Sequence, residues 1–465
     1  MAIKSGASLP TKETRMIITK DKKFYKSLLL LALPIALQNL LTFSVGLCDS
    51  LMIGQLGDSA ISGVYMGNQI QTLLQVFSGG VEGAMLILNA QYWGEDDGES
   101  IKKITSLGLK FTFALSLAVS LFCAVFPKFV ISLFTSDEET VKLGAEYLSI
   151  IAYSFVFFCL TQGFIAAMRS VESPKVGLIV SSISLAVNAS LNYLLIFGNL
   201  GLPALGIKGA AIATVIARIL EFAAVAIYVF FIDKKLKYRL KYLLAHDGQL
   251  LRDFVKYGLP IMAGQLIWAA NTFSASMIMG RLDGEGVIAA LSVANTLNNL
   301  SYVVMNGMSG AVGIITGKTI GEGKLEKIRE YSYTVQLIFI ALGLVTGAAL
   351  QLIKAPYISL YSISAAAEKE ASALINVLSF TIIGTSYQNA CLFGLVKSGG
   401  DVSFVMKNDF FFVFFIVIPS ALIASYFNAP AYLVFLCLKS DQILKCFVAA
   451  VKINRFNWIK KLTKS

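Results

Sequence analysis

Charged residues are scarce in this sequence, and histidine is almost absent. Charged side chains make up 14% of the 465 residues, whereas about a quarter is usual in a soluble domain. The single histidine is His246, and the six cysteines lie inside apolar runs without CxxC spacing. These absences exclude a soluble globular domain, and they leave no metal-ligand, redox or catalytic cluster that would argue for an enzyme.

Long apolar runs are what the chain has instead. Hydrophobic residues make up 56% of it, and the mean hydropathy is +0.71. Because about 20 apolar residues cross a bilayer as a helix, the runs predict an all-α polytopic membrane protein with about twelve transmembrane helices, about six in each half. No cleavable signal peptide is expected, since the segment before Lys26 is polar and basic. The runs lie at roughly 27–55, 60–92, 104–127, 142–168, 176–198, 207–232, 257–281, 286–319, 330–353, 368–396, 404–427 and 430–451.

The two halves of the chain repeat each other. The shift between matched residues is 226 for the first pair (260 − 34) and 228 for the last (397 − 169). An even number of helices per half makes the repeats parallel, an arrangement typical of transporters that carry a substrate at the interface of their halves. The matched pairs are Pro34 with Pro260, Gly54 with Gly280, Gly94 with Gly321, and Arg169 with Lys397.

Positive charge is concentrated in three segments, although the net charge of +11 could suggest a nucleic-acid partner. Basic residues gather before residue 27, between Lys234 and Lys256, and after Lys452. The positive-inside rule places all three in the cytoplasm, so the charge indicates topology and no nucleic acid is expected. We expect residues 1–232 and 257–465 to form two lobes, 233–256 to link them in the cytoplasm, and both termini to be cytoplasmic in the plasma (inner) membrane.

Asp49 is an acid deep in the first apolar run, and its repeat partner is Ala275. A carboxylate near the middle of a bilayer costs about 2.5–3.5 kcal/mol, so such a residue usually faces a cavity and handles ions or protons. The alternative is that Asp49 lies near the outer interface and is merely solvated. Asn188 and Asn192 are four residues apart and share a helix face. Their oxygens suit a cation such as Na⁺, but Asn and Thr also commonly join membrane helices by hydrogen bonds.

Several motifs together resemble the multidrug and toxic compound extrusion (MATE) family, over nearly the whole chain. The resemblance implies the fold of that family and the MOP superfamily, with two six-helix lobes, and export of organic compounds in exchange for Na⁺ or H⁺. It implies an N-lobe cation site at Asp49, Asn188, Asn192, Thr214 and the Ala210 carbonyl, and a bend of the first helix at Pro34. The motifs are Pro34 with the run Asp49–Gly57, Ala90-Gln91 with Gly94, Asn188 to Asn192 before Ile196-Phe197-Gly198, and Gly209 to Thr214.

The chain departs from this family's pattern at three positions. Some archaeal relatives have a second acid where this chain has Asn192. NorM-like members carry carboxylates in the seventh and tenth helices, where this chain has Trp268 and Ser386. Coupling is therefore expected in the N-lobe alone.

A polar and aromatic cleft between the lobes is also expected, because aromatic faces and methionine suit flat lipophilic cations. For Glu82, a functional role and a structural hydrogen bond to a neighbouring helix are equally compatible with the sequence. Arg218 with Glu221, and Lys439 with Asp441 and Lys445, are expected to be ion pairs that snorkel to the inner interface. The residues expected to line the cleft are Gln38, Tyr65, Asn68, Glu82, Gln265, Trp268, Asn295, Tyr302, Met305 and Tyr387.

The sequence thus predicts a monomeric antiporter that exports organic, cationic amphipathic compounds by alternating access. Na⁺ or H⁺ would be the coupling ion, with possible Na⁺ binding at Asp49, and no other cofactor is expected. The partners would be a small organic substrate and the lipid bilayer. The alternative is a lipid-linked saccharide flippase of the same superfamily, which a basic central cleft would favour.

Overall fold

The computed structural model describes residues 18–245, 247–282, 286–361 and 363–463. His246 and the basic residues before position 18 lie outside the described residues. Every regular element in these ranges is helical, and none of the described residues forms a strand. The prediction of an all-α protein is confirmed.

The first half of the chain forms eight α-helices. A 3₁₀ turn, η1, follows α1 at Gly54–Leu56, and a second, η2, precedes α8 at Asn199–Gly201. The last turn of α8 continues as a π-helical segment, η3, at Tyr228–Ile232. The helices are α1 (Lys22–Ile53), α2 (Asp58–Gly94), α3 (Gly98–Val125), α4 (Pro127–Ser132), α5 (Glu138–Ile151), α6 (Ser154–Ser170), α7 (Lys175–Phe197) and α8 (Gly206–Ile227).

The second half also forms eight α-helices, after a short 3₁₀ turn, η4, at Leu240–Leu244. Two π-helical segments extend α12 and α13: η5 at Asn389–Lys397 and η6 at Val413–Val417. The helices are α9 (Gly248–Met279), α10 (Val287–Gly321), α11 (Leu325–Ile358), α12 (Ala365–Gln388), α13 (Val402–Phe412), α14 (Ile418–Tyr426), α15 (Ala431–Leu438) and α16 (Asp441–Asn454).

Within the described residues, eight helices are long and apolar enough to cross a membrane, or nine when α5 and α6, bent by 52°, count as one span. The other three spans expected from the sequence correspond to α9, to α12 with η5, and to α15 with α16. These segments are helical, but they are more polar than the eight long helices or are interrupted by breaks. The chain is therefore a multi-pass membrane protein.

The polar breaks between the apolar runs serve as helix caps. Asp97 accepts a hydrogen bond from the amide of Ser100 (3.0 Å), and Asp137 accepts one from the amide of Thr140 (2.8 Å). Ser364 caps α12 in the same way. Short polar side chains at these positions satisfy amides that have no partner inside the helix, so they determine where each helix begins.

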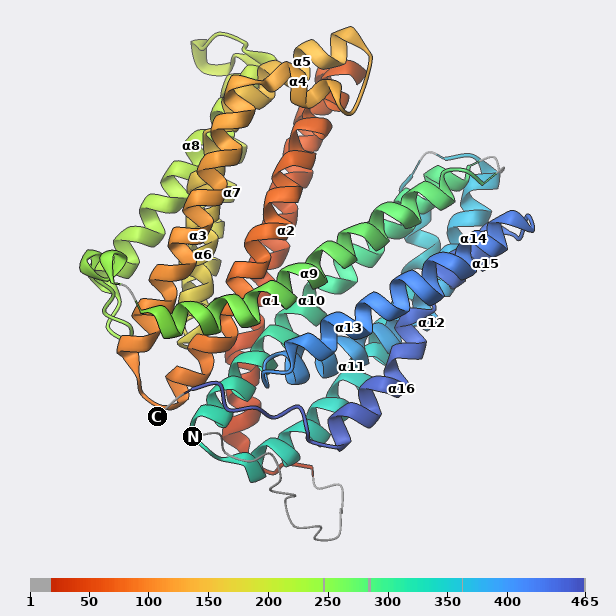
Figure 1. Cartoon of the computed structure of the whole chain (residues 1–465). Helices are drawn as coiled ribbons and strands as arrows, with labels where there is room; N and C mark the ends of the chain where they lie inside the picture. The colour runs from red at the N-terminus through yellow and green to blue at the C-terminus, as the bar shows by residue number, and fades with distance from the viewer. Residues whose placement is uncertain (1–17, 246, 283–285, 362, 464–465) are drawn as a thin grey trace.

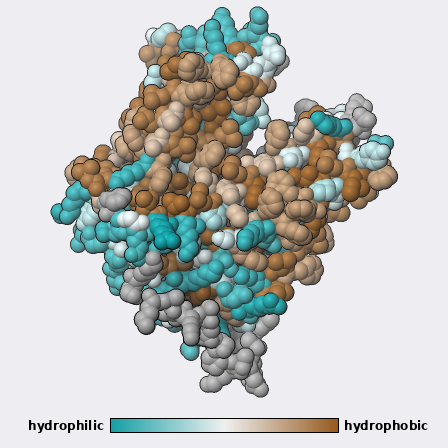
Figure 2. All heavy atoms as spheres, viewed as in Figure 1, coloured by the Kyte–Doolittle hydropathy of each residue, from teal (hydrophilic) through white to brown (hydrophobic). Residues whose placement is uncertain are grey.

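The helices form two arms that separate toward one end of the molecule and meet at the other, where the described part of the chain begins and ends (Figure 1). Helices α3 and α6–α8 lie in one arm, and α11–α15 lie in the other. The space-filling view shows a notch between the arms at the separated end (Figure 2). We call this the open end, and the end that holds the termini the closed end.

Two repeat-related helix contacts join the arms where they meet. Helix α2 packs on α9, and α10 packs on α1. A Cβ atom at Gly80 would lie 2.8 Å from the Cα of Met262, and one at Gly307 would lie 2.8 Å from the Cα of Ala36. Only glycine allows this approach of the backbones. Gly80 and Gly307 are related by the repeat, with a shift of 227 (307 − 80), so the junction itself has twofold pseudosymmetry.

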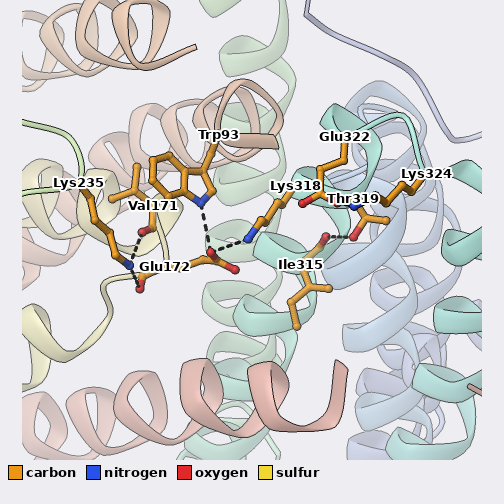
Figure 3. Close-up of polar contacts among 9 residues, drawn as sticks. All are labelled: Trp93, Val171, Glu172, Lys235, Ile315, Lys318, Thr319, Glu322 and Lys324. Carbon is orange, nitrogen blue, oxygen red and sulfur yellow. Dashed lines mark hydrogen bonds and ion pairs between the residues drawn. The ribbon is translucent and has the colours of Figure 1, made fainter. Parts of the chain in front are cut away.

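The closed end is held by polar contacts between segments far apart in the sequence (Figure 3). Oε2 of Glu172, in the loop between α6 and α7, accepts from the Lys318 ammonium (2.7 Å) and from the Trp93 indole (3.2 Å). The Lys235 ammonium donates to the backbone carbonyls of Val171 (3.0 Å) and Glu172 (2.6 Å). One loop thereby ties α2, α10 and the segment after α8 together.

The C-terminal segment crosses the same seam. The amide of Leu462 donates to Gln91 Oε1 (2.8 Å), and Gln91 Nε2 donates to the carbonyl of Lys460 (3.2 Å). Glu95 pairs with Lys461 (2.7 Å) and accepts from the Thr463 hydroxyl (2.6 Å). Because Gln91 and Glu95 lie at the end of α2, the last described residues of the second half are bound to the first half.

The first prediction concerns the two glycines that meet at the closed end. A Cβ at Gly321 would overlap the carbonyl oxygen of Gln91 and lie 3.1 Å from the Cα of Gly94. Backbone atoms cannot rotate away, so Gly321→Ala should cost about 1–3 kcal/mol in this arrangement and force the halves apart there. Spin labels at Lys175 and Glu326, exposed positions on α7 and α11, should report a longer distance by double electron–electron resonance.

Gly98→Ala is the matched control, because a Cβ at Gly98 meets nothing within 4 Å. An unchanged distance distribution in Gly321→Ala would contradict the role assigned to this contact.

Candidate cation site and transport pathway

The five residues expected to form the N-lobe cation site lie on one continuous chain of hydrogen bonds. The Asn192 amide donates to Oδ1 of Asp49 (2.5 Å) and to Oδ1 of Asn188 (3.3 Å). The Asn188 amide donates to the Thr214 hydroxyl (3.3 Å), which donates to the carbonyl of Ala210 (3.0 Å). This series of hydrogen bonds runs from α1 to α7 to α8, three helices that pack on one another.

The site is buried on its α7 side. Asn192 is 0% exposed and Asn188 is 1% exposed, while Asp49 is partly buried. Oδ1 of Asn192 is buried and has no hydrogen-bond donor, and an unsatisfied buried acceptor normally costs about 1–3 kcal/mol. This free oxygen lies beside a carboxylate that no lysine or arginine pairs with among the described residues.

These oxygens fit a monovalent cation. A carboxylate, two amide oxygens, a hydroxyl and a backbone carbonyl form a singly charged set of hard oxygen ligands. The cationic side chain of Arg218, one turn after Thr214 on α8, is already paired with Glu221 (2.6 Å). Arg218 also interacts electrostatically with Asp49, but it forms no ion pair with it. The same hydrogen bonds also join the three helices, so the roles of these residues remain predictions.

Several residues expected to line the cleft are accessible near the junction or in the open part of the structure. Tyr65 on α2 is 63% exposed and Trp268 on α9 is 59% exposed. Asn68, one turn from Tyr65, accepts a hydrogen bond from the Tyr147 hydroxyl (3.2 Å). Gln265 lies at the junction, where its amide approaches Gly79 of α2. Asn295 is partly buried on α10.

Other expected cleft residues are packed inside a lobe. Met305 is 0% exposed and belongs to the hydrophobic core of the second half, so it does not line the cleft in this structure. The Tyr387 hydroxyl donates to Gln336 of α11 (2.7 Å), and Tyr302 is partly buried on α10. Periodicity does not separate residues that face the cleft from those that face the interior of the lobe.

Gln38 and Glu82 belong to a polar group that also contains Arg169. The Arg169 guanidinium donates to Gln38 Oε1 (2.7 Å), and Arg169 and Glu82 interact electrostatically. Gln38 is only 2% exposed. The repeat alignment identified Arg169 as the counterpart of Lys397, but no sequence signal indicated its contact with Gln38, 131 residues away.

The expected ion pairs of Arg218 with Glu221 and of Lys445 with Asp441 form, but the expectation that they snorkel to the interface is wrong. The Lys445 ammonium lies between Asp409 (2.8 Å) and Asp441 (3.0 Å), with 6%, 13% and 4% of the three side chains exposed. Arg218 and Glu221 are 12% and 2% exposed. Both groups are buried between helices of their own half, where each charge is neutralised by its partner rather than by water. Asp409, on α13, was missed altogether.

The second half has no counterpart to the Asp49 site. Ala275, the repeat partner of Asp49, packs against a hydrophobic cluster. Ser386 is fully buried and donates its hydroxyl to the carbonyl of Phe339 (2.7 Å). Neither Ala275 nor Ser386 carries a charge. The first half therefore has an acid at this position of the repeat, and the second half does not.

Two repeat-related helical halves, a notch between them and an acid held by amides within the membrane region are the architecture of a secondary transporter. The family model described as MatE matches residues 34–194 and 260–423. The chain therefore belongs to the MATE family of membrane transporters, as the motifs predicted.

Named relatives are distant in sequence, but the similarity extends over most of the chain. The probable multidrug resistance protein NorM of Halalkalibacterium halodurans is 26% identical over 355 residues, which cover 76% of each chain. The probable multidrug resistance protein YoeA of Bacillus subtilis is 26% identical over 333 residues, covering 69% of this chain and 70% of its own.

Solved structures share the fold. A structure described as the outward-facing conformation of a multidrug resistance MATE family transporter of the MOP superfamily has a TM-score of 0.83 at 17% identity, over 94% of this chain and 98% of that one. The eukaryotic MATE transporter AtDTX14 has a TM-score of 0.83 at 18% identity, over 95% and 97% of the two chains. These similarities confirm the predicted MATE fold.

The second prediction tests the acid of the site. Asp49→Asn keeps the shape of the side chain but removes the negative charge to which Asn192 donates its hydrogen bond. Efflux of a cationic dye from cells should fall to the level of cells without the transporter, while the amount of folded protein in the membrane is unchanged. Ser50→Ala, at the neighbouring position on α1, is the control and should keep wild-type efflux. Normal efflux in Asp49→Asn would remove Asp49 from the mechanism.

Proposed function

We propose that this protein is a cation-coupled antiporter that exports organic, predominantly cationic amphipathic compounds by alternating access. The observation that carries the proposal is the buried hydrogen-bond chain from Asp49 through Asn192 and Asn188 to Thr214. Relatives named as probable multidrug resistance proteins support the substrate class. The coupling ion is Na⁺ or H⁺, and no other cofactor takes part.

Coupling follows from competition for the charge of Asp49. A cation that enters from the open end gains the Asp49 carboxylate and the free oxygen of Asn192. Its binding changes the packing of α1 on α7, and the helix responds at Pro34, which lies inside α1. Substrate affinity at the open end then falls. Because the effect is reciprocal, substrate that binds from the other side favours release of the cation.

Alternating access uses the two ends of the bundle. We place the closed end, with the three basic segments and both termini, in the cytoplasm of the plasma (inner) membrane. The arrangement in Figure 1 is then the outward-facing state. Residues 1–232 and 257–465 move as two lobes, 233–256 link them, and one monomer is the working unit. To face inward, the lobes must break the ion pair of Glu172 with Lys318 and the contacts of the C-terminal segment.

The alternative flippase reading has less support. A headgroup that carries phosphates needs a strongly basic central cleft, and the expected cleft residues that the structure exposes most, Tyr65 and Trp268, are uncharged aromatics. The curated relatives are also named for multidrug resistance. Counterflow in proteoliposomes tests the proposal directly: in inside-out vesicles loaded with the higher Na⁺ or proton concentration, the outward ion gradient should drive uptake of cationic dyes against their own gradient. No gradient-driven movement of any dye would overturn it.

The third prediction concerns the asymmetry of the lobes. Asn188→Ala and Thr214→Ala each remove a ligand oxygen, so the cation concentration for half-maximal efflux should rise about tenfold. Trp268→Ala and Ser386→Ala should leave that concentration unchanged, and Trp268→Ala, at an exposed position, should alter which dyes are exported. The reverse pattern would mean that the coupling site lies in the second half.

The fourth prediction concerns the ion. The amide oxygen of Asn192 can ligate Na⁺ but cannot carry a proton. The single negative charge of the site is therefore the carboxylate of Asp49, and Na⁺ and H⁺ compete for it. Efflux should be stimulated by external Na⁺ and should weaken as external pH falls, because protonated Asp49 no longer attracts Na⁺. Initial rates across a grid of Na⁺ and pH measure this. Efflux that ignores Na⁺ but follows an inward proton gradient would contradict the choice of ion and leave Asp49 in place.

A further inference from the structure

Lys397 is a cation at the junction of the lobes that has no close partner. It ends the π-helical segment η5, and its side chain is partly buried. Among the residues that the structure describes, no hydrogen bond and no ion pair holds its ammonium group. The ammonium lies 5.6 Å from the centre of the Phe393 ring, and a Cβ at Gly83 of α2 would lie 3.7 Å from it. Lys397 therefore reaches from one half of the chain to the other.

The carboxylate nearest to this lysine is already engaged. Asp409 interacts electrostatically with Lys397, but its hydrogen-bonding partner is Lys445, at 2.8 Å. Lys445 also pairs with Asp441 at 3.0 Å. Asp409 is thus held by another lysine, and the positive charge of Lys397 remains uncompensated at close range.

A small pocket opens beside this ammonium. Lys397, Phe393 and Asp409 line one part of it, and Pro260, Gly264 and Gln265 of α9 line the other. It has room for one small group, and the apolar part of its wall lowers the screening of charge. Pro260 is the repeat partner of Pro34, so the pocket lies beside the equivalent proline-containing segment of the second half.

The two halves differ in the sign of their unpaired charge. In the first half Arg169 is bonded to Gln38, and Asp49 is a carboxylate without an ion pair among the described residues. In the second half the repeat partner of Arg169 is Lys397, which has no such bond. An unpaired charge within a membrane protein costs several kcal/mol and is usually retained for ligand or ion handling.

We propose that Lys397 and the pocket beside it form an anion subsite at the lobe junction, which takes a monoanionic group: an inorganic anion or the carboxylate of a transported compound. The proposal rests on the proposed function, because Lys397 becomes accessible only through alternating access. While the lobes touch at Gly83, α2 covers Lys397, and when the lobes part toward the closed end, α2 uncovers Lys397. The substrate range then includes zwitterions, whose carboxylate the C-lobe binds.

Equilibrium binding to the purified full chain in detergent tests the subsite. The probes are two rhodamine dyes that differ in one group, a cationic methyl ester and its parent carboxylic acid, followed by fluorescence anisotropy. A charge-assisted hydrogen bond is worth about tenfold or more in affinity. Lys397→Gln should therefore weaken binding of the acid about tenfold and leave the ester unchanged. Lys397→Arg should restore binding of the acid.

Two further variants keep the result interpretable. Lys407→Gln removes an exposed lysine of α13 outside the pocket and should change neither dye. Lys397→Met keeps the length of the side chain without its charge and replaces Lys397→Gln if that protein does not fold. Adding chloride to a buffer that contains no carboxylate and no other small inorganic monoanion distinguishes the two sources of the anion.

If chloride competes with the acid and this competition disappears in Lys397→Gln, the subsite also takes an inorganic anion. If chloride has no effect but Lys397→Gln still loses binding of the acid, the subsite takes the carboxylate of the compound. Equal affinity for the acid in wild type and neutral variants, or equal loss of both dyes, overturns the subsite. Binding and exchange of the ester with no dependence on Lys397 leaves the proposed function intact. Absence of binding for both dyes overturns both.

Discussion

The close approach of α2 to α9 and of α1 to α10 is the constraint on which the rest of this structure depends. Both contacts need a residue without a side chain, Gly80 in one and Gly307 in the other, and the repeat relates the two. The lobes therefore touch over a narrow region near the middle of their helices. On one side of it the arms diverge into a notch, and on the other they are held together by polar contacts that can exchange with water.

The polar contacts around this junction are of two kinds: those within one lobe and those between the two lobes. Ion pairs such as Arg218 with Glu221 and Lys445 with Asp409 are buried within one lobe, where breaking them would leave a charge without a partner. They fix the shape of each lobe as it moves. The contacts of Glu172 and Glu95 cross between the lobes and involve partly exposed side chains, whose ion pairs are individually weak. The lobes can thus separate at the closed end without loss of their own packing.

Much of this arrangement could be predicted from the sequence. Asp49 stood out as an acid deep in an apolar run, and the spacing of four put Asn188 and Asn192 on one face of α7. The family resemblance then joined these residues with Thr214 and Ala210 into one predicted site. The repeat paired Gly94 with Gly321, and these two residues meet at the closed end. Spacing and repeat patterns of this kind are local or periodic, so they can be recognised in a single sequence without a structure.

What the sequence did not reveal depends on contacts between distant segments. The bond from Arg169 to Gln38 and the binding of Gln91 to the C-terminal segment join residues 131 and 371 positions apart, and neither has a periodic pattern. Asp409 follows Lys407 and Asn408 in α13, and the sequence does not say which lysine it faces. The burial of Met305 inside a lobe has the same origin, because an apolar face toward the cleft and one toward the core have the same spacing.

The central claim is that Asp49 and the amides beside it bind the coupling cation in the first half of the chain. Equilibrium binding of radioactive sodium to the purified protein tests it most directly. The account predicts one saturable site per chain, displaced by protons, lost in Asp49→Asn and retained in Ser386→Ala. Saturable sodium binding that survives Asp49→Asn would contradict it.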